Sequence, residues 1–77
     1  MDSIDFEKII SINPQIRFGK PCIVGTRIAV SDILQWLASG MTNEEILADY
    51  PELTLTALHA ALAFAAKRDN ISRIIAA

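Results

Sequence analysis

Hydrophobic and polar positions change their spacing about one third of the way along this 77-residue chain. Between residues 9 and 30 the apolar residues form short runs or alternate with polar ones, a pattern typical of strands and turns. From residue 31 onward they recur every three or four positions, as on amphipathic helices. We therefore predict one mainly α domain over 1–77, with an N-terminal segment 1–8, short strands and turns at 9–30, a helical core at 31–69 and a tail at 70–77.

The first part contains three candidate strands, at residues 16–18, 22–24 and 28–30. Gly19 and Gly25 separate them, since glycine is the residue that most readily adopts turn conformations. Pro21 lacks a backbone N–H and favours extended geometry at Lys20. We therefore expect an irregular turn over residues 18–21 rather than a regular two-residue hairpin.

The beginnings and ends of the first two predicted helices follow from local capping residues. Ser31 is a candidate N-cap for the first helix, and Gly40 is a typical C-terminal stop. Thr42 and Glu45 have the spacing of a capping box, in which each side chain binds the other residue's backbone N–H. Pro51 disfavours helical geometry at the preceding residue and ends the second helix there.

The third predicted helix is apolar on almost all sides. Thr54 caps it and it runs to about Asp69, while residues 71–77 are either helical or frayed. Eleven of the fourteen residues at 53–66 are apolar, and a monomer this small has few other elements to cover them. We expect a homodimer or a complex with another protein, whose interface involves Leu55, Ala57, Leu58, Ala61, Leu62 and Phe64.

Charge is segregated although the net charge is only −2. Arg17, Lys20 and Arg27 give residues 17–30 a charge of +3, whereas the five acidic residues of 31–66 give that block −5. The basic residues are therefore our candidates for binding a partner protein or nucleic acid. A solvated face without a binding role is the plainer alternative for any single charge.

Nothing in the chain points to catalysis, a cofactor or a metal. Cys22 lies in an apolar run and His59 on an alanine-rich helix, so a core thiol and an incidental histidine are better interpretations than a nucleophile and base. One cysteine and one histidine are too few for a zinc site. Glu44 and Glu45 are adjacent on a helix and diverge, unlike paired metal ligands. The glycines do not fit a phosphate-binding spacing.

The predicted location is cytoplasmic. The acidic N-terminus, MDSIDFEK, lacks the apolar run of a signal peptide. The apolar stretch at 53–66 is shorter than the roughly 18 residues that a bilayer span needs.

Helices at 43–49 and 54–69 have the proportions of a helix-turn-helix. Direct base readout needs Arg, Lys, Asn or Gln near the start of the second helix, where this chain has Thr54, Thr56, Ala57 and His59. If DNA is bound, Arg17, Lys20 and Arg27 are better candidates, as a wing that contacts the phosphate backbone.

The segment from Gly19 to Val30, GKPCIVGTRIAV, is the most distinctive motif of the chain. It is either a structural turn, in which Arg27 satisfies carbonyls or pairs with an acid, or a surface that faces a partner. Together with the later stretch SGM..EEIL.DYP.LT, at residues 39–54, it resembles the bacterial domain-of-unknown-function family 433 over residues 9–67. The chain differs from that family at Ala29, where proline is common, and around Ala57, where an acidic residue is frequent.

The resemblance implies a homeodomain-like, helix-turn-helix-like fold of three helices preceded by a small β element. It also implies a non-catalytic, VapB-like antitoxin that neutralises a PIN-like ribonuclease toxin and represses its own operon. Because a PIN-type active site is acidic, insertion of Arg17, Lys20 or Arg27 is the inhibitory mode that we expect. The alternatives are a DNA-binding regulator without a toxin partner and a purely structural homodimer.

Overall fold

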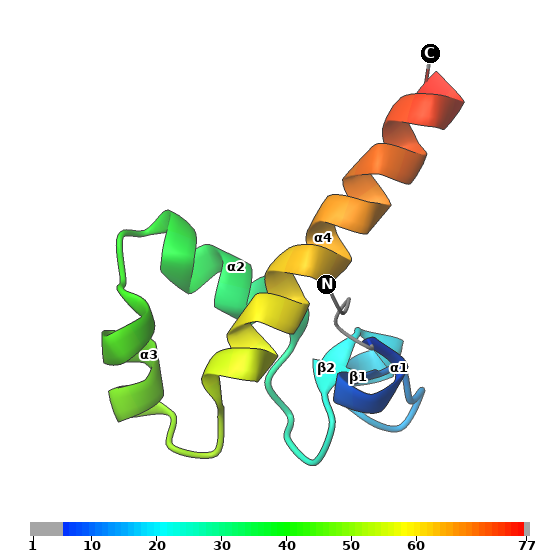
Figure 1. Cartoon of the computed structure of the whole chain (residues 1–77). Helices are drawn as coiled ribbons and strands as arrows, with labels where there is room; N and C mark the ends of the chain where they lie inside the picture. The colour runs from blue at the N-terminus through cyan, green and yellow to red at the C-terminus, as the bar shows by residue number, and fades with distance from the viewer. Residues whose placement is uncertain (1–5, 77) are drawn as a thin grey trace.

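The structure is a computed structural model that describes the backbone of residues 6–76 and the side chains of residues 8–68. A short N-terminal α/β unit lies beside a group of three helices (Figure 1). The elements in chain order are α1 (Phe6–Ile9), β1 (Ile10–Ser11), the 3₁₀-helix η1 (Arg17–Gly19), β2 (Cys22–Ile23), α2 (Val30–Ala38), α3 (Asn43–Asp49) and α4 (Leu55–Ala76). The chain is thus mainly helical with a small β element, as predicted.

The core forms where α2, α3 and α4 meet. Each of these helices contributes one large aliphatic side chain with no exposed surface, namely Ile33, Ile46 and Leu58. Helix α4 contacts α1, α2 and α3, and small residues on the same face, Ala57 and Ala61, are buried and permit a close approach of the neighbouring backbones. Helix α4 is therefore the central element of the fold, because its contacts join α1, α2 and α3.

The β element is a two-stranded antiparallel sheet in which Ile10 pairs with Ile23 and Ser11 pairs with Cys22. The predicted strand at 22–24 is confirmed for its first two residues. The predicted strand at 28–30 is reduced to a single bridge between Ala29 and Cys22, because helix α2 already begins at Val30.

The first helix begins earlier than predicted. Ala29, not Ser31, occupies the N-cap position of α2, and its backbone N–H donates to Asp32 Oδ2 at 3.0 Å. The carboxylate three residues into the helix therefore supplies the capping contact. At the other end, Gly40 adopts a left-handed φ of +102° and its N–H donates to the Leu37 carbonyl, as predicted for a C-terminal stop.

The caps of the other two helices confirm the predictions. The Thr42 N–H donates to Glu45 Oε1 at 2.9 Å, and the Glu45 N–H donates to Thr42 Oγ1 at 3.1 Å. Helix α3 ends before Pro51. The Ala57 N–H donates to Thr54 Oγ1, which places Thr54 at the start of α4.

Helix α4 is longer than predicted. It continues without a break from Leu55 to Ala76, so the expected end near Asp69 is wrong, whereas of the two alternatives for 71–77 the helical one holds for the backbone of 71–76. Its C-terminal part extends past the other elements (Figure 1).

In the part of the chain that the structure describes, no helix combines the length and hydropathy of a bilayer span.

Candidate partner-binding surface

A tight turn at residues 13–20 forms the first part of the candidate site. Asn13 initiates it, because its Oδ1 accepts the Gln15 N–H at 2.9 Å and its carbonyl accepts the Ile16 N–H. The Ile16 carbonyl then accepts the Gly19 N–H at 3.1 Å. Lys20 is extended, as Pro21 predicts, with φ −66° and ψ 141°. The chain therefore leaves the turn in position to form β2.

The residues at the tip of this turn have left-handed backbone conformations. Arg17, Phe18 and Gly19 have φ values of 52°, 58° and 83°. The predicted strand at 16–18 is therefore wrong: an alternating pattern over three residues does not separate a strand from a turn. A left-handed conformation costs a residue with a side chain roughly 1–2 kcal/mol, so contacts elsewhere must stabilise Arg17 and Phe18.

Arg17 provides such contacts. Its Nη1 donates to the Arg27 carbonyl at 2.8 Å and to Asp32 Oδ2 at 2.9 Å. Asp32 Oδ2 also accepts the Ala29 N–H. One carboxylate oxygen thus joins the turn to the first residues of α2, across fifteen positions of sequence.

The environment of this ion pair stabilises its charged state. Partial burial of the Asp32 carboxyl acts to raise its pKa, but hydrogen bonds from Arg17 and the Ala29 N–H, with the charges of Arg17 and Lys20, outweigh it and lower the pKa below the ordinary range. In turn, the hydrogen bond and charge of Asp32 raise the pKa of Arg17. Both groups are therefore ionised at neutral pH.

We expect Asp32→Asn to lower the free energy of unfolding by about 0.5–1 kcal/mol at pH 7, since the pair is partly exposed and screened by solvent. A lowered carboxyl pKa stabilises the fold above the unfolded-state pKa of about 4, and this stabilisation is lost as the pH falls through the lower folded-state pKa. The difference between wild type and variant should accordingly shrink below about pH 4. Urea titrations at several pH values measure it. Asp49→Asn, at an exposed position, is the matched control. If both variants lose the same free energy of unfolding at every pH, the stabilising role of the Arg17–Asp32 ion pair is contradicted.

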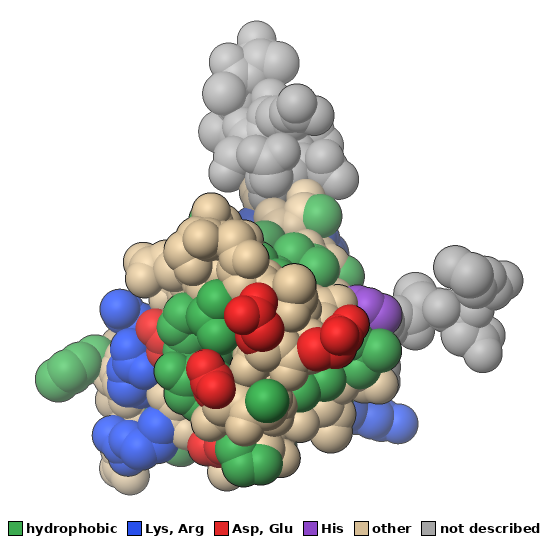
Figure 2. All heavy atoms as spheres, turned by 90° about the vertical axis from the view of Figure 1, so that its left-hand side faces the viewer, with side chains coloured by type: hydrophobic (Ala, Val, Ile, Leu, Met, Phe, Trp, Pro, Cys, Tyr) green, Lys and Arg blue, Asp and Glu red, His purple; other side chains and the backbone are tan. Residues whose placement is uncertain are grey.

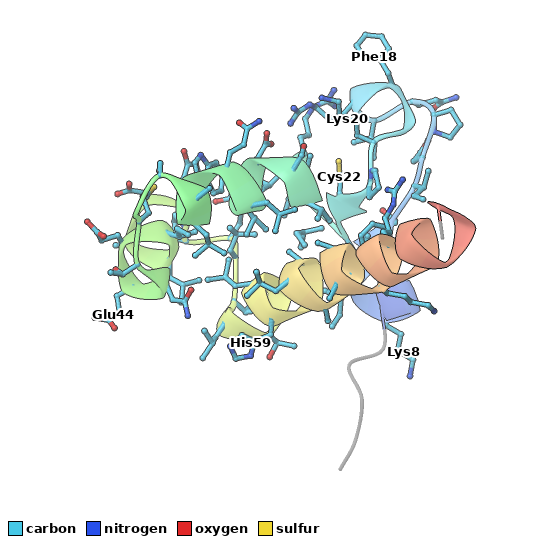
Figure 3. The ribbon with its side chains drawn as sticks, turned by 90° about the horizontal axis from the view of Figure 1, so that it is seen from above. Lys8, Phe18, Lys20, Cys22, Glu44 and His59 are labelled. Atoms are coloured by element: carbon cyan, nitrogen blue, oxygen red, sulfur yellow. The ribbon has the colours of Figure 1, made fainter. Side chains whose placement is uncertain are left out.

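Phe18 is the most exposed hydrophobic residue among the described side chains, with an exposed fraction of 100%. It points away from the rest of the chain, and Lys20 lies beside the same turn (Figure 3). Sequence reasoning missed Phe18 because an aromatic residue in an alternating run is normally assigned to a core. The sequence feature that indicates an exposed Phe18 is its position in a turn, directly before Gly19.

The second half of the motif is another turn, which presents Arg27. The Thr26 hydroxyl donates to the Ile23 carbonyl at 2.9 Å and accepts the Ile28 N–H at 3.0 Å. Gly25 has a φ of +81°. Thr26 and Gly25 are therefore structural, while the Arg27 side chain is exposed. We call Phe18, Lys20 and Arg27 together the basic turn surface.

The structure brings only part of the predicted helical interface to the surface. Ala57, Leu58 and Ala61 are buried in the chain's own core, so the prediction of a partner interface is corrected for these three. The reason is that α2 and α3 cover this face of α4. Leu55 and Leu62 remain 46% and 43% exposed, and Phe64 is half-buried. These three are the predicted interface residues that a partner can reach.

The side chains considered for catalysis and metal binding do not converge. Cys22 is buried in β2 whereas His59 is exposed on α4, and Figure 3 places them in different parts of the molecule. On the face formed by α2 and α3, acidic side chains lie among hydrophobic ones, while lysine and arginine side chains lie toward the left and lower right edges (Figure 2). Among the described residues, no three His, Cys, Asp or Glu side chains form a group able to hold a metal ion.

The fold and the basic turn surface thus define a small helical protein with a protruding aromatic turn. The chain belongs to the family described as Protein of unknown function (DUF433), whose model matches residues 10–65; this confirms the predicted family. It is similar to the crystal structure of a DUF433 member protein from Anabaena variabilis ATCC 29413, with 33% identity and a TM-score of 0.76 over 92% of this chain and 71% of that chain. No curated protein matches this chain.

Proposed function

We propose that this protein is a non-catalytic binding module of the antitoxin type, which binds a PIN-like ribonuclease through the basic turn surface and neutralises it. The observation that supports the proposal most strongly is Phe18: a fully exposed aromatic side chain on a left-handed backbone. Strained residues of this kind persist where the surrounding structure holds them, and they occur preferentially at functional sites.

The contacts of Arg17 make the turn suitable for binding. Phe18 has no buried side-chain surface that offsets its backbone strain, so other contacts of the turn must do so, above all the bonds from Arg17 to the Arg27 carbonyl and to Asp32. A braced turn loses little conformational entropy when a partner binds. Aromatic residues that enter a partner's pocket contribute disproportionately to affinity. The turn therefore holds the backbone of Phe18 in place and leaves its side chain available as an anchor.

The exposed cations determine which partner suits the surface. Asp32 already engages Arg17, so Lys20 and Arg27 are the members of the predicted basic set with exposed side chains to offer. Two cations beside an apolar anchor complement an acidic cleft. The family resemblance implies a PIN-like ribonuclease as the partner, and the active site of such an enzyme is acidic.

We expect Lys20→Glu and Arg27→Glu each to weaken neutralisation by about tenfold or more, because a like charge then faces an acidic site. RNA cleavage by a PIN-like ribonuclease of the same genome, titrated with the purified chain, measures the effect. Lys8→Glu is the matched charge reversal, since Lys8 points away on another side of the molecule (Figure 3). Failure of the wild-type chain to slow any such enzyme would refute the function, whereas unchanged inhibition by both variants would refute this surface.

The structure offers less support for a DNA-binding regulator. The exposed positions of the first two turns of α4 include Leu55, Thr56 and His59, none of them a side chain suited to bidentate base recognition. Exposed Asp49 and Glu52 precede the helix and would repel phosphates. Binding of an operator fragment with steep salt dependence, together with no effect on ribonucleases, would favour the regulator instead.

A further inference from the structure

A groove of about 480 Å³ separates the first turns of α2 from the middle of α4. Val30 and Leu34 form its wall on α2, and Phe64 and Ala65 form its wall on α4. Lys20 and Arg68 lie at the groove with exposed side chains, and the remaining lining residues, Pro21 and Ser31, are uncharged. Among the described residues, the groove is thus apolar inside, and the charged side chains that line it are both positive.

The spacing of the wall residues suits a helix. Val30 and Leu34 of the α2 wall are four positions apart, and on α4 the wall residue Phe64 is four positions from Arg68, which also lines the groove. Residues at this spacing form a ridge along a helix, and the ridge of a third helix can pack between two such ridges. Binding of an amphipathic helix in an apolar groove is a recurrent mode of peptide recognition.

The charges specify the polar side of that helix. The Arg68 guanidinium carbon lies 5.5 Å from the centre of the Phe64 ring, which holds a cation directly beside the apolar wall. Because none of the groove residues that the structure describes is acidic, carboxylates on the incoming helix would meet Lys20 and Arg68 directly. A second copy that docked groove against groove would instead bring the same cations together. The electrostatics therefore favour an acidic partner over self-association.

We propose that the α2–α4 groove binds an acidic amphipathic helix of the partner protein, with its apolar stripe against Leu34 and Ala65 and its carboxylates at Lys20 and Arg68. This proposal rests on the proposed function, since it assigns a second contact to the same partner. Lys20 belongs both to the basic turn surface and to the groove, so one partner can occupy both at once.

A pair of synthetic helical peptides tests the groove without the partner. Both carry the same stripe of leucine and alanine; one has glutamates beside the stripe and the other lysines. We expect the full-length chain to bind the glutamate peptide at least about tenfold more tightly than the lysine peptide in fluorescence anisotropy titrations. Ala65→Phe, which fills the groove, and Arg68→Glu should each weaken binding of the glutamate peptide by about tenfold. Lys67→Glu, a substitution at the neighbouring position outside the groove lining, should leave the affinity for the glutamate peptide unchanged.

Each other outcome overturns the proposal. Equal affinity for the two peptides, or unchanged binding by Ala65→Phe, shows that the groove does not recognise an acidic helix. A dimer of the wild-type chain that Ala65→Phe converts to a monomer in sedimentation shows that a second copy occupies the groove. Neutralisation assays separate this proposal from the proposed function: a ribonuclease still inhibited by the Ala65→Phe variant refutes the groove alone, and one that wild type never inhibits refutes the function.

Discussion

Replacement of Leu58 by alanine should lower the free energy of unfolding by about 2–5 kcal/mol, the usual cost of deleting a fully buried leucine side chain. Leu58 has no exposed surface, and among the described side chains the other large aliphatic ones without exposed surface, Ile33 and Ile46, come from α2 and α3. A cavity at this position would weaken the packing of α4 against both helices. Because a domain of this size has only about 5–10 kcal/mol of stability, the loss would leave it near the limit of folding.

Leu62→Ala is the matched control, since it removes the same atoms from the same helix one turn later, where the side chain is 43% exposed. We expect it to cost less than about 1 kcal/mol. Urea denaturation can be followed by the fluorescence of the single tryptophan, Trp36, which stacks on Tyr50 with ring centres 4.2 Å apart. If Leu62→Ala costs as much as Leu58→Ala and the cost depends on protein concentration, a second copy covers this face and the predicted homodimer is formed there.

Replacement of Phe18 by alanine should weaken binding to the partner by at least about 30-fold, or roughly 2 kcal/mol, while leaving the free energy of unfolding nearly unchanged. The two effects separate because the side chain is fully exposed and contributes to no core. Phe18→Gly should abolish the same contact and raise the free energy of unfolding by up to about 1 kcal/mol, since glycine adopts a φ of 58° without strain.

Affinity for a PIN-like ribonuclease, measured by calorimetry beside a urea titration of each variant, tests both expectations. Val24→Ala is the control, because Val24 is also an exposed hydrophobic side chain but lies outside the basic turn surface. Loss of stability in Phe18→Ala would show that the aromatic ring serves the fold. Equal binding by Phe18→Ala and wild type would show that it is not an anchor.

The features predicted correctly from sequence depend on contacts between near neighbours. Thr42 and Glu45 cap each other across three positions, and Thr54 caps the backbone of Ala57. Gly40 and Pro51 end helices through their own backbone preferences. Such signals are visible in the sequence because both partners lie within one turn.

The features that sequence reasoning missed depend on residues far apart. Asp32 was predicted only as one acid of a negative block, yet it caps α2 and binds Arg17. The turn at Arg17 and Phe18 cannot be recognised from a three-residue alternation, because its strained backbone is held by that distant carboxylate. The same applies to the groove, whose walls come from α2 and α4.

By itself the sequence determined the helical class, most of the helix ends, the family and the basic character of residues 17–30, because periodicity, caps and charge are local properties. Only the tertiary structure decided which side of α4 is core and which is available to a partner, since burial of Leu58 rather than Leu62 depends on where Ile33 and Ile46 lie. It also decided that Phe18 protrudes and that Arg17 braces the turn instead of reaching outward. These features depend on packing between elements, and the hydrophobic periodicity of a single helix does not predict how elements pack.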